Sequence, residues 1–236
     1  MFDWARALEN CPLPRGKRIA ILTDAGGPGV IAADSLETNG LLLSQLAEST
    51  LKALTNYLPP SASVHNPVDM LASASPDAYA TCLNLLLQDE NVDGALVILP
   101  PPPMYKTEEV AKAMIEVIGK FEKPVVIALM GSTLVEEARK TFQRANIPTY
   151  PFPERAASAL GALARRAKHL TTEHTESKET QKRISVDFVN SVVNLDELPT
   201  TYGIQTAPIK LARDKNEITA IADELGYPLV MKIASP

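Results

Sequence analysis

The residues best suited to chemistry lie in a glycine-rich loop within residues 18–40, RIAILTDAGGPGVIAADSLETNG. An apolar run, predicted to be a strand, leads into Ala25, Gly26, Gly27 and Gly29, and helical spacing follows. The first N–H groups of a helix have no partners inside the helix and lie at the positive end of its dipole. Glycine tolerates positive φ and lets a ligand approach the backbone, and Pro28 suits the first helical position. We therefore expect the loop to bind a phosphate or a carboxylate. A tight turn without a ligand is the alternative interpretation.

The loop matches neither of two common nucleotide-binding motifs, because no Lys-Ser/Thr pair follows it and its glycines do not have the G-x-G-x-x-G spacing. Four polar residues are candidate neighbours of the predicted site. Asp24 repels a phosphate unless it points away, and it could instead cap local backbone N–H groups. His65 precedes a loop expected near the same edge, either as a surface residue or as a phosphate contact. Asn66 favours an extended entry into the turn, and Asp69 is suited to cap the backbone or to meet a neighbouring domain.

The elements that position these residues alternate along the chain. Apolar runs at residues 19–23, 41–46, 94–99, 124–130 and 148–152 predict five strands, and helical patterns separate them. Such crossovers imply parallel pairing, and continuous apolar strands imply that both faces of the sheet are covered. We predict an α/β fold, a flavodoxin-like, doubly wound parallel sheet with the order 2-1-3-4-5. Its ligand edge is the carboxyl end of strands one and three, where the glycine loop leaves the sheet.

Helix ends are predicted from capping residues. Ser75 followed by Pro76 predicts the start of a helix that runs to about residue 89. Thr107 is expected to cap a helix that ends at about residue 120. The last helix of the sheet domain is predicted from residue 153 to about residue 168.

Composition limits the class of protein. The chain has 236 residues and a formal net charge of -5, which provides no basic field for nucleic acid. No apolar run is long enough to span a bilayer, and no signal peptide is predicted. The two cysteines have no metal-binding spacing and form no disulfide framework, which favours a reducing cytoplasm.

The sequence changes character beyond residue 168. Residues 171–183 are polar and charged, and they predict a solvated linker between a sheet domain at residues 1–170 and a second region at residues 184–236. The second region has helical spacing at residues 215–225 and an apolar run near its end, so we expect an incomplete domain.

Four segments, RIAILTDAGGPGVIAADSLETNG, LPPSASVHNPVDM, GALVILPPP and KPVVIAL, occur in an order that resembles the NDP-forming acyl-CoA synthetases. This family includes the ADP-forming acetyl-CoA synthetases and their succinyl-CoA synthetase relatives. The resemblance covers residues 2–170. The final LGYPLVMKIASP is similar to the opening of an ATP-grasp domain, in which a lysine at the position of Lys232 helps to hold nucleotide phosphates.

The resemblance implies the reaction acyl-CoA + ADP + phosphate ⇌ acid + CoA + ATP, with a phosphoryl group carried by a histidine between two helix N-termini. The helix after the glycine loop would be one of the two. His65, His169 and His174 do not lie in the family's phosphohistidine motif. We therefore expect no catalytic residue in this chain, and expect CoA-binding and phosphohistidine-bearing domains in the same or a partner chain. The isolated chain is predicted to be inactive and to bind no cofactor, whereas ATP or ADP with Mg and CoA are expected for the full-length enzyme. A homo-oligomer is left open.

Two other interpretations remain at this stage. The chain could be a catalytically inactive module that senses acyl-CoA within a fused protein acetyltransferase. It could also be an unrelated receiver-like or flavin-binding domain, although clustered acids and aromatic residues are few.

Overall fold

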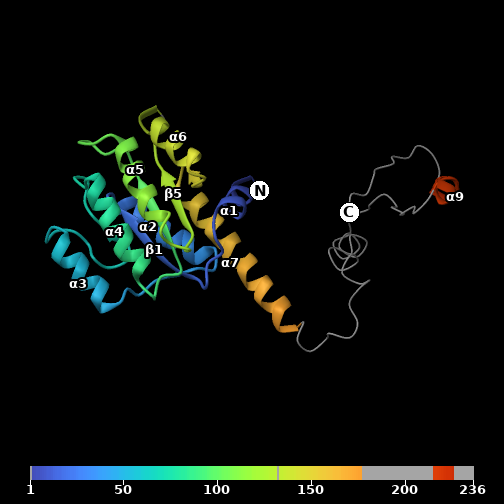
Figure 1. Cartoon of the computed structure of the whole chain (residues 1–236), viewed down its shortest axis with the longest axis horizontal. Coiled ribbons are helices and arrows are strands. Elements are labelled where there is room, and N and C mark those ends of the chain that lie inside the picture. The colour runs from blue at the N-terminus through green and yellow to red at the C-terminus, as the bar shows by residue number, and fades with distance from the viewer. Residues whose placement is uncertain (1, 132, 177–214, 226–236) are drawn as a thin grey trace. The chain divides into compact units, whose positions relative to one another are not determined.

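The computed structural model describes residues 2–131, 133–176 and 215–225 (Figure 1). The chain divides into two units, Met1–Ser177 and Lys178–Pro236. The described part of the second unit is helix α9, Lys215–Leu225, which confirms the helix predicted from the spacing of these residues. The other described elements belong to the first unit.

A parallel sheet with the order β2-β1-β4-β5-β6 forms the centre of the first unit. The predicted α/β fold and the predicted order 2-1-3-4-5 are thereby confirmed. A further strand, β3, was not predicted, because two residues are too few to show a periodicity. It pairs with the second half of β1, whereas β2 pairs with the first half. The strands are β1 Arg18–Thr23, β2 Leu42–Leu43, β3 Val68–Asp69, β4 Gly94–Leu99, β5 Val125–Leu129 and β6 Thr149–Tyr150.

Helices cover both faces of the sheet, as expected for strands that are apolar throughout. On β1, Ala20 and Leu22 face one core, and Ile19 and Ile21 face the other. The first core is closed by α3 Glu48–Tyr57, α4 Pro76–Gln88, α5 Thr107–Ile118 and α6 Glu136–Arg144, which follows the short 3-10 helix η1 Thr133–Val135. The second core is closed by α1 Phe2–Asn10, α2 Gly26–Thr38 and α7 Pro153–Glu176 (Figure 1).

The predicted helix ends are partly correct. Ser75 caps α4, because its Oγ accepts the N–H of Ala78 at 3.1 Å. Thr107 does not cap α5. It lies inside the helix and its hydroxyl donates to the carbonyl oxygen of Leu134 at 2.9 Å, which ties the loops after β4 and β5 together. Helix α7 continues to Glu176, past the predicted end near residue 168 and into the segment predicted to be a linker.

Helix α1 was not predicted, since Ala7 is its one buried residue. Contacts with residues far along the chain hold it in place. Asp3 accepts two hydrogen bonds from Arg155, at 2.6 and 2.7 Å, and its backbone carbonyl oxygen accepts the hydroxyl of Tyr150 at 2.9 Å. The indole N–H of Trp4 donates to the hydroxyl of Ser158 at 2.9 Å. These contacts fix helix α1 against α7 and the end of β6.

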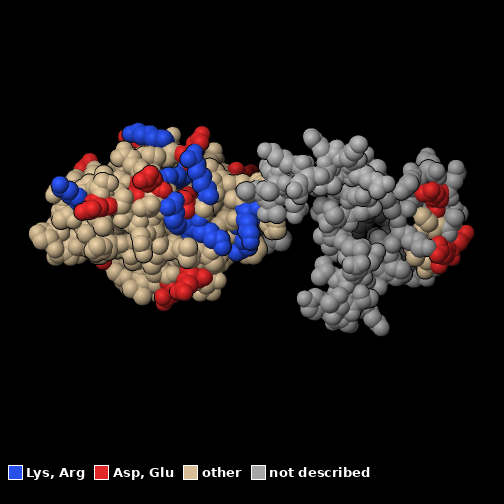
Figure 2. Space-filling view, turned by 90° about the horizontal axis from the view of Figure 1, so that it is seen from below, with Lys and Arg blue, Asp and Glu red and all other residues tan. Residues whose placement is uncertain are grey.

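The surface of the first unit carries both signs of charge. Figure 2 shows acidic and basic side chains on the same face of this unit. Two of the ion pairs are Lys112 with Glu108, at 2.7 Å, and Arg155 with Asp3, at 2.6 Å. Among the described helices, none is long and apolar enough to cross a membrane.

Candidate functional site

The glycine loop leaves the carboxyl end of β1 and enters α2 at once. Ala25 is the N-cap of α2 and provides no side-chain cap. The side chain of Thr23 fixes the position of Ala25, because its Oγ1 accepts the N–H of Ala25 and donates to the carbonyl oxygen of Ala25, each at 3.0 Å. The strand end and the helix start are thus joined rigidly, and the start of the helix faces the ligand edge of the sheet.

The first turn of α2 leaves two backbone donors available. Pro28 has no N–H, and the N–H of Gly29 bonds to the carbonyl oxygen of Ala25 at 3.3 Å. The remaining N–H groups of this turn belong to Gly26 and Gly27, and both residues are exposed. These donors, together with the positive end of the dipole of a 13-residue helix, form a surface suited to an oxyanion.

One detail of the predicted loop, the position of Pro28, is wrong. Pro28 is the third residue of α2, since the helix already begins at Gly26. The loop glycines do not have positive φ, because among the described glycines this conformation occurs at Gly40 and Gly131. Small size matters instead at two positions. A Cβ on Gly26 would lie 3.1 Å from Oδ2 of Asp69, and a Cβ on Gly29 would lie 3.3 Å from Cγ2 of Thr23. The glycines let the start of α2 pack closely against β1 and the end of β3.

Asp69 stands beside the start of α2. Its Oδ1 accepts the N–H of Leu71 at 2.9 Å, and its Oδ2 is the atom closest to the Cβ position of Gly26. A carboxylate at this place interacts favourably with the helix dipole. The Asp69 carboxylate also places a negative charge at the start of α2, and this charge repels an anion that binds there.

Asp24 is the one predicted neighbour that is deeply buried, with 5% of its surface exposed. Its Oδ1 has no hydrogen-bond partner among the described residues. Burial raises the pKa of this carboxyl to about 6; Tyr79 and the backbone N–H of Asp24 oppose the shift, and the charge of Asp69 adds to it. Tyr79, on α4, is a residue of this cluster that the sequence did not indicate, because a tyrosine on the apolar face of a helix is typical of the core.

Asn66 and His65 do not join the site. The Asn66 side chain lies against β1, where Oδ1 accepts the N–H of Ile21 at 2.8 Å and Nδ2 donates to the carbonyl oxygens of Ile19, at 2.8 Å, and Ser44, at 3.1 Å. It therefore satisfies backbone groups at the point where β2 separates from β1. The peptide bond from Asn66 to Pro67 is cis. His65 is exposed, and its backbone carbonyl oxygen accepts a hydrogen bond from the hydroxyl of Ser63 at 3.4 Å.

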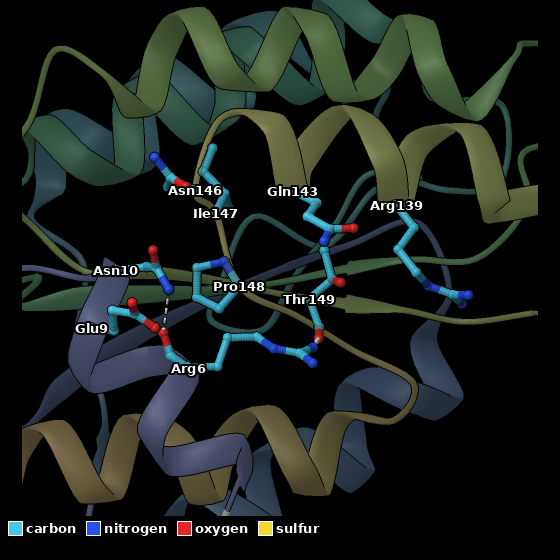
Figure 3. Close-up of a pocket in the computed structure, with 9 residues that line it drawn as sticks. All are labelled: Arg6, Glu9, Asn10, Arg139, Gln143, Asn146, Ile147, Pro148 and Thr149. Atoms are coloured by element: carbon cyan, nitrogen blue, oxygen red, sulfur yellow. Dashed lines mark hydrogen bonds between the residues drawn. The ribbon is translucent and has the colours of Figure 1, made fainter.

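A separate hollow of about 370 Å³ lies beside the amino end of β6 (Figure 3). Its arginines are already engaged. Arg6 reaches Thr149 and donates to the carbonyl oxygen of that residue at 3.1 Å, and Arg139 pairs with Glu136 at 2.8 Å. The hollow contains none of the predicted site residues and lies at the opposite edge of the sheet from the start of α2. It is lined by Arg6, Glu9, Asn10, Arg139, Gln143, Asn146, Ile147, Pro148 and Thr149.

The described part of the chain shows no metal-binding group. Its histidines, cysteines and carboxylates do not form a group of three or more that could hold a metal ion. Lys232, the residue predicted to hold nucleotide phosphates, lies outside the described residues.

Comparisons with known proteins agree with the arrangement of the first unit. Residues 19–172 match the family model of the Ligase-CoA domain, and residues 190–236 match that of an ATP-grasp domain. The chain is 34% identical to an ADP-forming acetate–CoA ligase of Archaeoglobus fulgidus, and the alignment covers the full length of this chain and 35% of that protein. It is 42% identical to the alpha subunit of an ADP-forming acetate–CoA ligase of Pyrococcus furiosus, and the alignment covers 72% of this chain and 38% of that subunit.

A solved structure extends the likeness. An acetyl-coenzyme A synthetase of Ca. Korarchaeum cryptofilum, in complex with phosphate and ADP, aligns with a TM-score of 0.68 and 34% identity. The alignment covers 73% of this chain and 38% of that one. The chain spans between a third and two fifths of the length of each of these three relatives. The sheet order, the glycine loop at the head of α2 and the family match together show that the chain belongs to the Ligase-CoA domain family of the ADP-forming acyl-CoA synthetases.

Proposed function

We propose that this chain is part of an ADP-forming acyl-CoA synthetase, and that the start of α2 stabilises a phosphoryl group during the reaction. The phosphoryl group is carried by a histidine of another segment, in the same or a partner chain. Ala25, Gly26, Gly27 and Gly29 form the site. The observation that supports it best is a helix without a side-chain cap, whose first two residues, Gly26 and Gly27, are exposed at the ligand edge of the sheet.

The physical role of such a site is electrostatic. A phosphoryl group in transfer carries charge on several oxygens, and catalysis consists mainly of holding it and stabilising this charge. Backbone donors held by Thr23 and by the body of α2 are already oriented before the anion arrives, so little reorganisation is required. The relative solved with phosphate and ADP supports an oxyanion as the ligand class.

The other components of the reaction belong elsewhere in this proposal. The described residues offer no group for Mg²⁺, and Lys232, the residue expected to hold nucleotide phosphates, lies outside them. We assign ATP or ADP, with Mg²⁺, to the ATP-grasp region and CoA to a separate domain. The ATP-grasp match at residues 190–236 supports the assignment of the nucleotide.

The site can be tested at Gly27, because apart from its chain neighbours and the backbone of its own helix no described atom lies within 4 Å of the Cβ that a side chain would place there. Gly27→Ala keeps the backbone donors and adds no charge. Gly27→Asp places a carboxylate in the first turn of α2, where it competes with an external anion for the same donors. Both variants fit the space, so a difference between them reports charge.

Titration of the chain with inorganic phosphate, followed by amide NMR, is the measurement. We expect the Gly26 and Gly27 signals of the wild type to shift, and the Gly26 signal of Gly27→Ala to shift with a similar Kd. In Gly27→Asp we expect binding at least about tenfold weaker, the effect of about 1.4 kcal/mol of repulsion. Unmoved wild-type signals at high phosphate, or equal binding by the two variants, would contradict the proposal.

A further inference from the structure

Asp24 is the described residue whose environment is hardest to explain by structure alone. It is 5% exposed, and its Oδ1 has no partner among the described residues. A buried polar atom without a hydrogen bond destabilises the fold, and such atoms are uncommon in native proteins. An unsatisfied carboxyl oxygen beside a candidate anion site therefore calls for a functional explanation.

Burial and the charge of Asp69 make the negative charge of Asp24 unfavourable, and they outweigh the Tyr79 hydroxyl and the Asp24 backbone N–H, which favour it. From α4, the hydroxyl of Tyr79 has one hydrogen, and the carbonyl oxygen of Ile98 lies 3.3 Å from it as an acceptor. From the end of β3, Asp69 contributes a charge of the same sign. A proton on Asp24 would remove the cost of burying its charge and the repulsion between its charge and that of Asp69. The neutral carboxyl could donate to the oxygen of Tyr79, which would keep its own hydrogen for Ile98.

Asp24 is also placed to act on the helix entrance. It directly precedes Ala25, the N-cap of α2, and it lies close enough to Asp69 for their charges to interact. Asp69 in turn reaches to within 3.1 Å of the Cβ position of Gly26, the first residue of α2. An oxyanion at the N–H groups of Gly26 and Gly27 would share this small region with two carboxylates.

We propose that binding of an oxyanion at the start of α2 is coupled to the uptake of one proton by Asp24, so that Asp24 determines the pH range in which the site accepts its ligand. This rests on the proposed function. One proton from solvent joins the Asp24 carboxylate as the anion binds, so the protein–anion complex gains one negative charge fewer than the anion carries. The coupling is reciprocal: a bound anion raises the proton affinity of Asp24, and a protonated Asp24 raises the affinity for the anion.

The pKa of Asp24 supports the coupling in the neutral range. Burial, aided by the charge of Asp69, raises this pKa to about 6, so the carboxyl is mostly ionised at pH 8 and mostly protonated at pH 5. A free aspartate would be ionised across this whole interval.

Sulfate is the appropriate probe, because it stays a dianion between pH 5 and 8, whereas phosphate itself titrates in this range. The Kd for sulfate is measured by amide NMR on the full chain at pH 5, 6, 7 and 8. We expect the wild-type Kd to be at least about tenfold weaker at pH 8 than at pH 5. We expect Asp24→Asn to bind sulfate with nearly the same Kd at every pH. Calorimetry at pH 7 in two buffers of different ionisation enthalpy should show proton uptake by the wild type and none by Asp24→Asn.

Two controls separate Asp24 from its neighbours. His65, exposed in the loop before β3, would also attract an anion more strongly when protonated, so His65→Gln must retain the pH dependence. Asp69→Asn keeps an acceptor for the N–H of Leu71 and should bind sulfate more tightly, with the pH dependence moved to lower pH.

The outcomes distinguish this inference from the proposed function. Sulfate binding that does not change with pH, or a pH dependence that persists in Asp24→Asn, overturns the role of Asp24 and leaves the anion site in place. Failure of the wild type and of Asp24→Asn to bind sulfate or phosphate at any pH overturns both.

Discussion

Replacing Asp24 by asparagine should stabilise the first unit in a manner that depends on pH. The folded state raises the pKa of Asp24 from 3.8 to about 6, mainly through burial, so the folded chain binds this proton more tightly than the unfolded chain. Stability from the protonated carboxyl is therefore fully present below pH 3.8 and is lost as the pH rises through about 6. Asparagine cannot titrate, so Asp24→Asn does not lose this stability as the pH rises.

The magnitude follows from the size of the shift. About two pKa units at 1.36 kcal/mol each correspond to about 3 kcal/mol over the whole titration, and the interval from pH 4 to pH 7.5 covers about 2 kcal/mol of it. Any difference in hydrogen bonding between the amide of the variant and the neutral carboxyl of the wild type is the same at every pH. The prediction therefore concerns the difference between two conditions: the advantage of Asp24→Asn over the wild type grows by about 2 kcal/mol between pH 4 and pH 7.5.

Urea unfolding followed by tryptophan fluorescence is a suitable assay. Trp4 is the single tryptophan of the chain and reports on the first unit, because its indole bonds to Ser158 and its ring lies 5.3 Å from the guanidinium of Arg165. The free energies of unfolding are compared at pH 4 and 7.5 for the wild type and Asp24→Asn, with m-values checked for equality. A stability difference that is the same at both pH values would refute the reasoning about the buried carboxyl.

Two further predictions concern the turn before β3 and the activity of the chain. Asn66→Ala should lower the free energy of unfolding by about 2–4 kcal/mol, because backbone groups of the fully buried Ile19 and Ile21 lose their partner. As a control, the substitution Ser63→Ala at an exposed residue should change it by less than about 0.5 kcal/mol. Similar effects of the two substitutions in urea unfolding would contradict the role of Asn66. The 236-residue chain supplied with acetyl-CoA, ADP and phosphate should form no ATP in a luciferase assay, and sustained formation would show that the phosphorylated histidine lies within it.

Much of the fold could be predicted because periodic burial is a local property. The strand at Gly94–Leu99 is a run of six buried apolar residues, and its ends coincide with the predicted ends. The start of α4 follows from the chemistry of Ser75 and Pro76 alone. Once the alternation of strands and helices is known, right-handed crossovers leave few possible sheet orders. The position of the glycine loop at the ligand edge follows from the same argument.

The details of the candidate site could not be predicted in this way, because each depends on a partner far along the chain. Asn66 is a turn residue in the sequence, but its side chain bonds to β1. Thr107 is suited to cap a helix, but its hydroxyl bonds to Leu134 instead. The loop glycines are compatible with unusual backbone angles, but their φ values are not positive. Glycine is favoured there because Asp69 lies close to Gly26 and Thr23 lies close to Gly29, which leaves little space for a side chain.

The sequence by itself determined the layered α/β architecture, the order of the sheet and the place where a helix N-terminus meets the ligand edge, since these follow from local hydrophobic periodicity and from chain connectivity. Only the tertiary structure decided the electrostatic character of that edge. It brings Tyr79 of α4 and Asp69 of β3 against Asp24, and it removes the Asp24 carboxyl from water. A pKa depends on the solvation and charges around a group, and these are set by residues that are neighbours in space and distant in the chain.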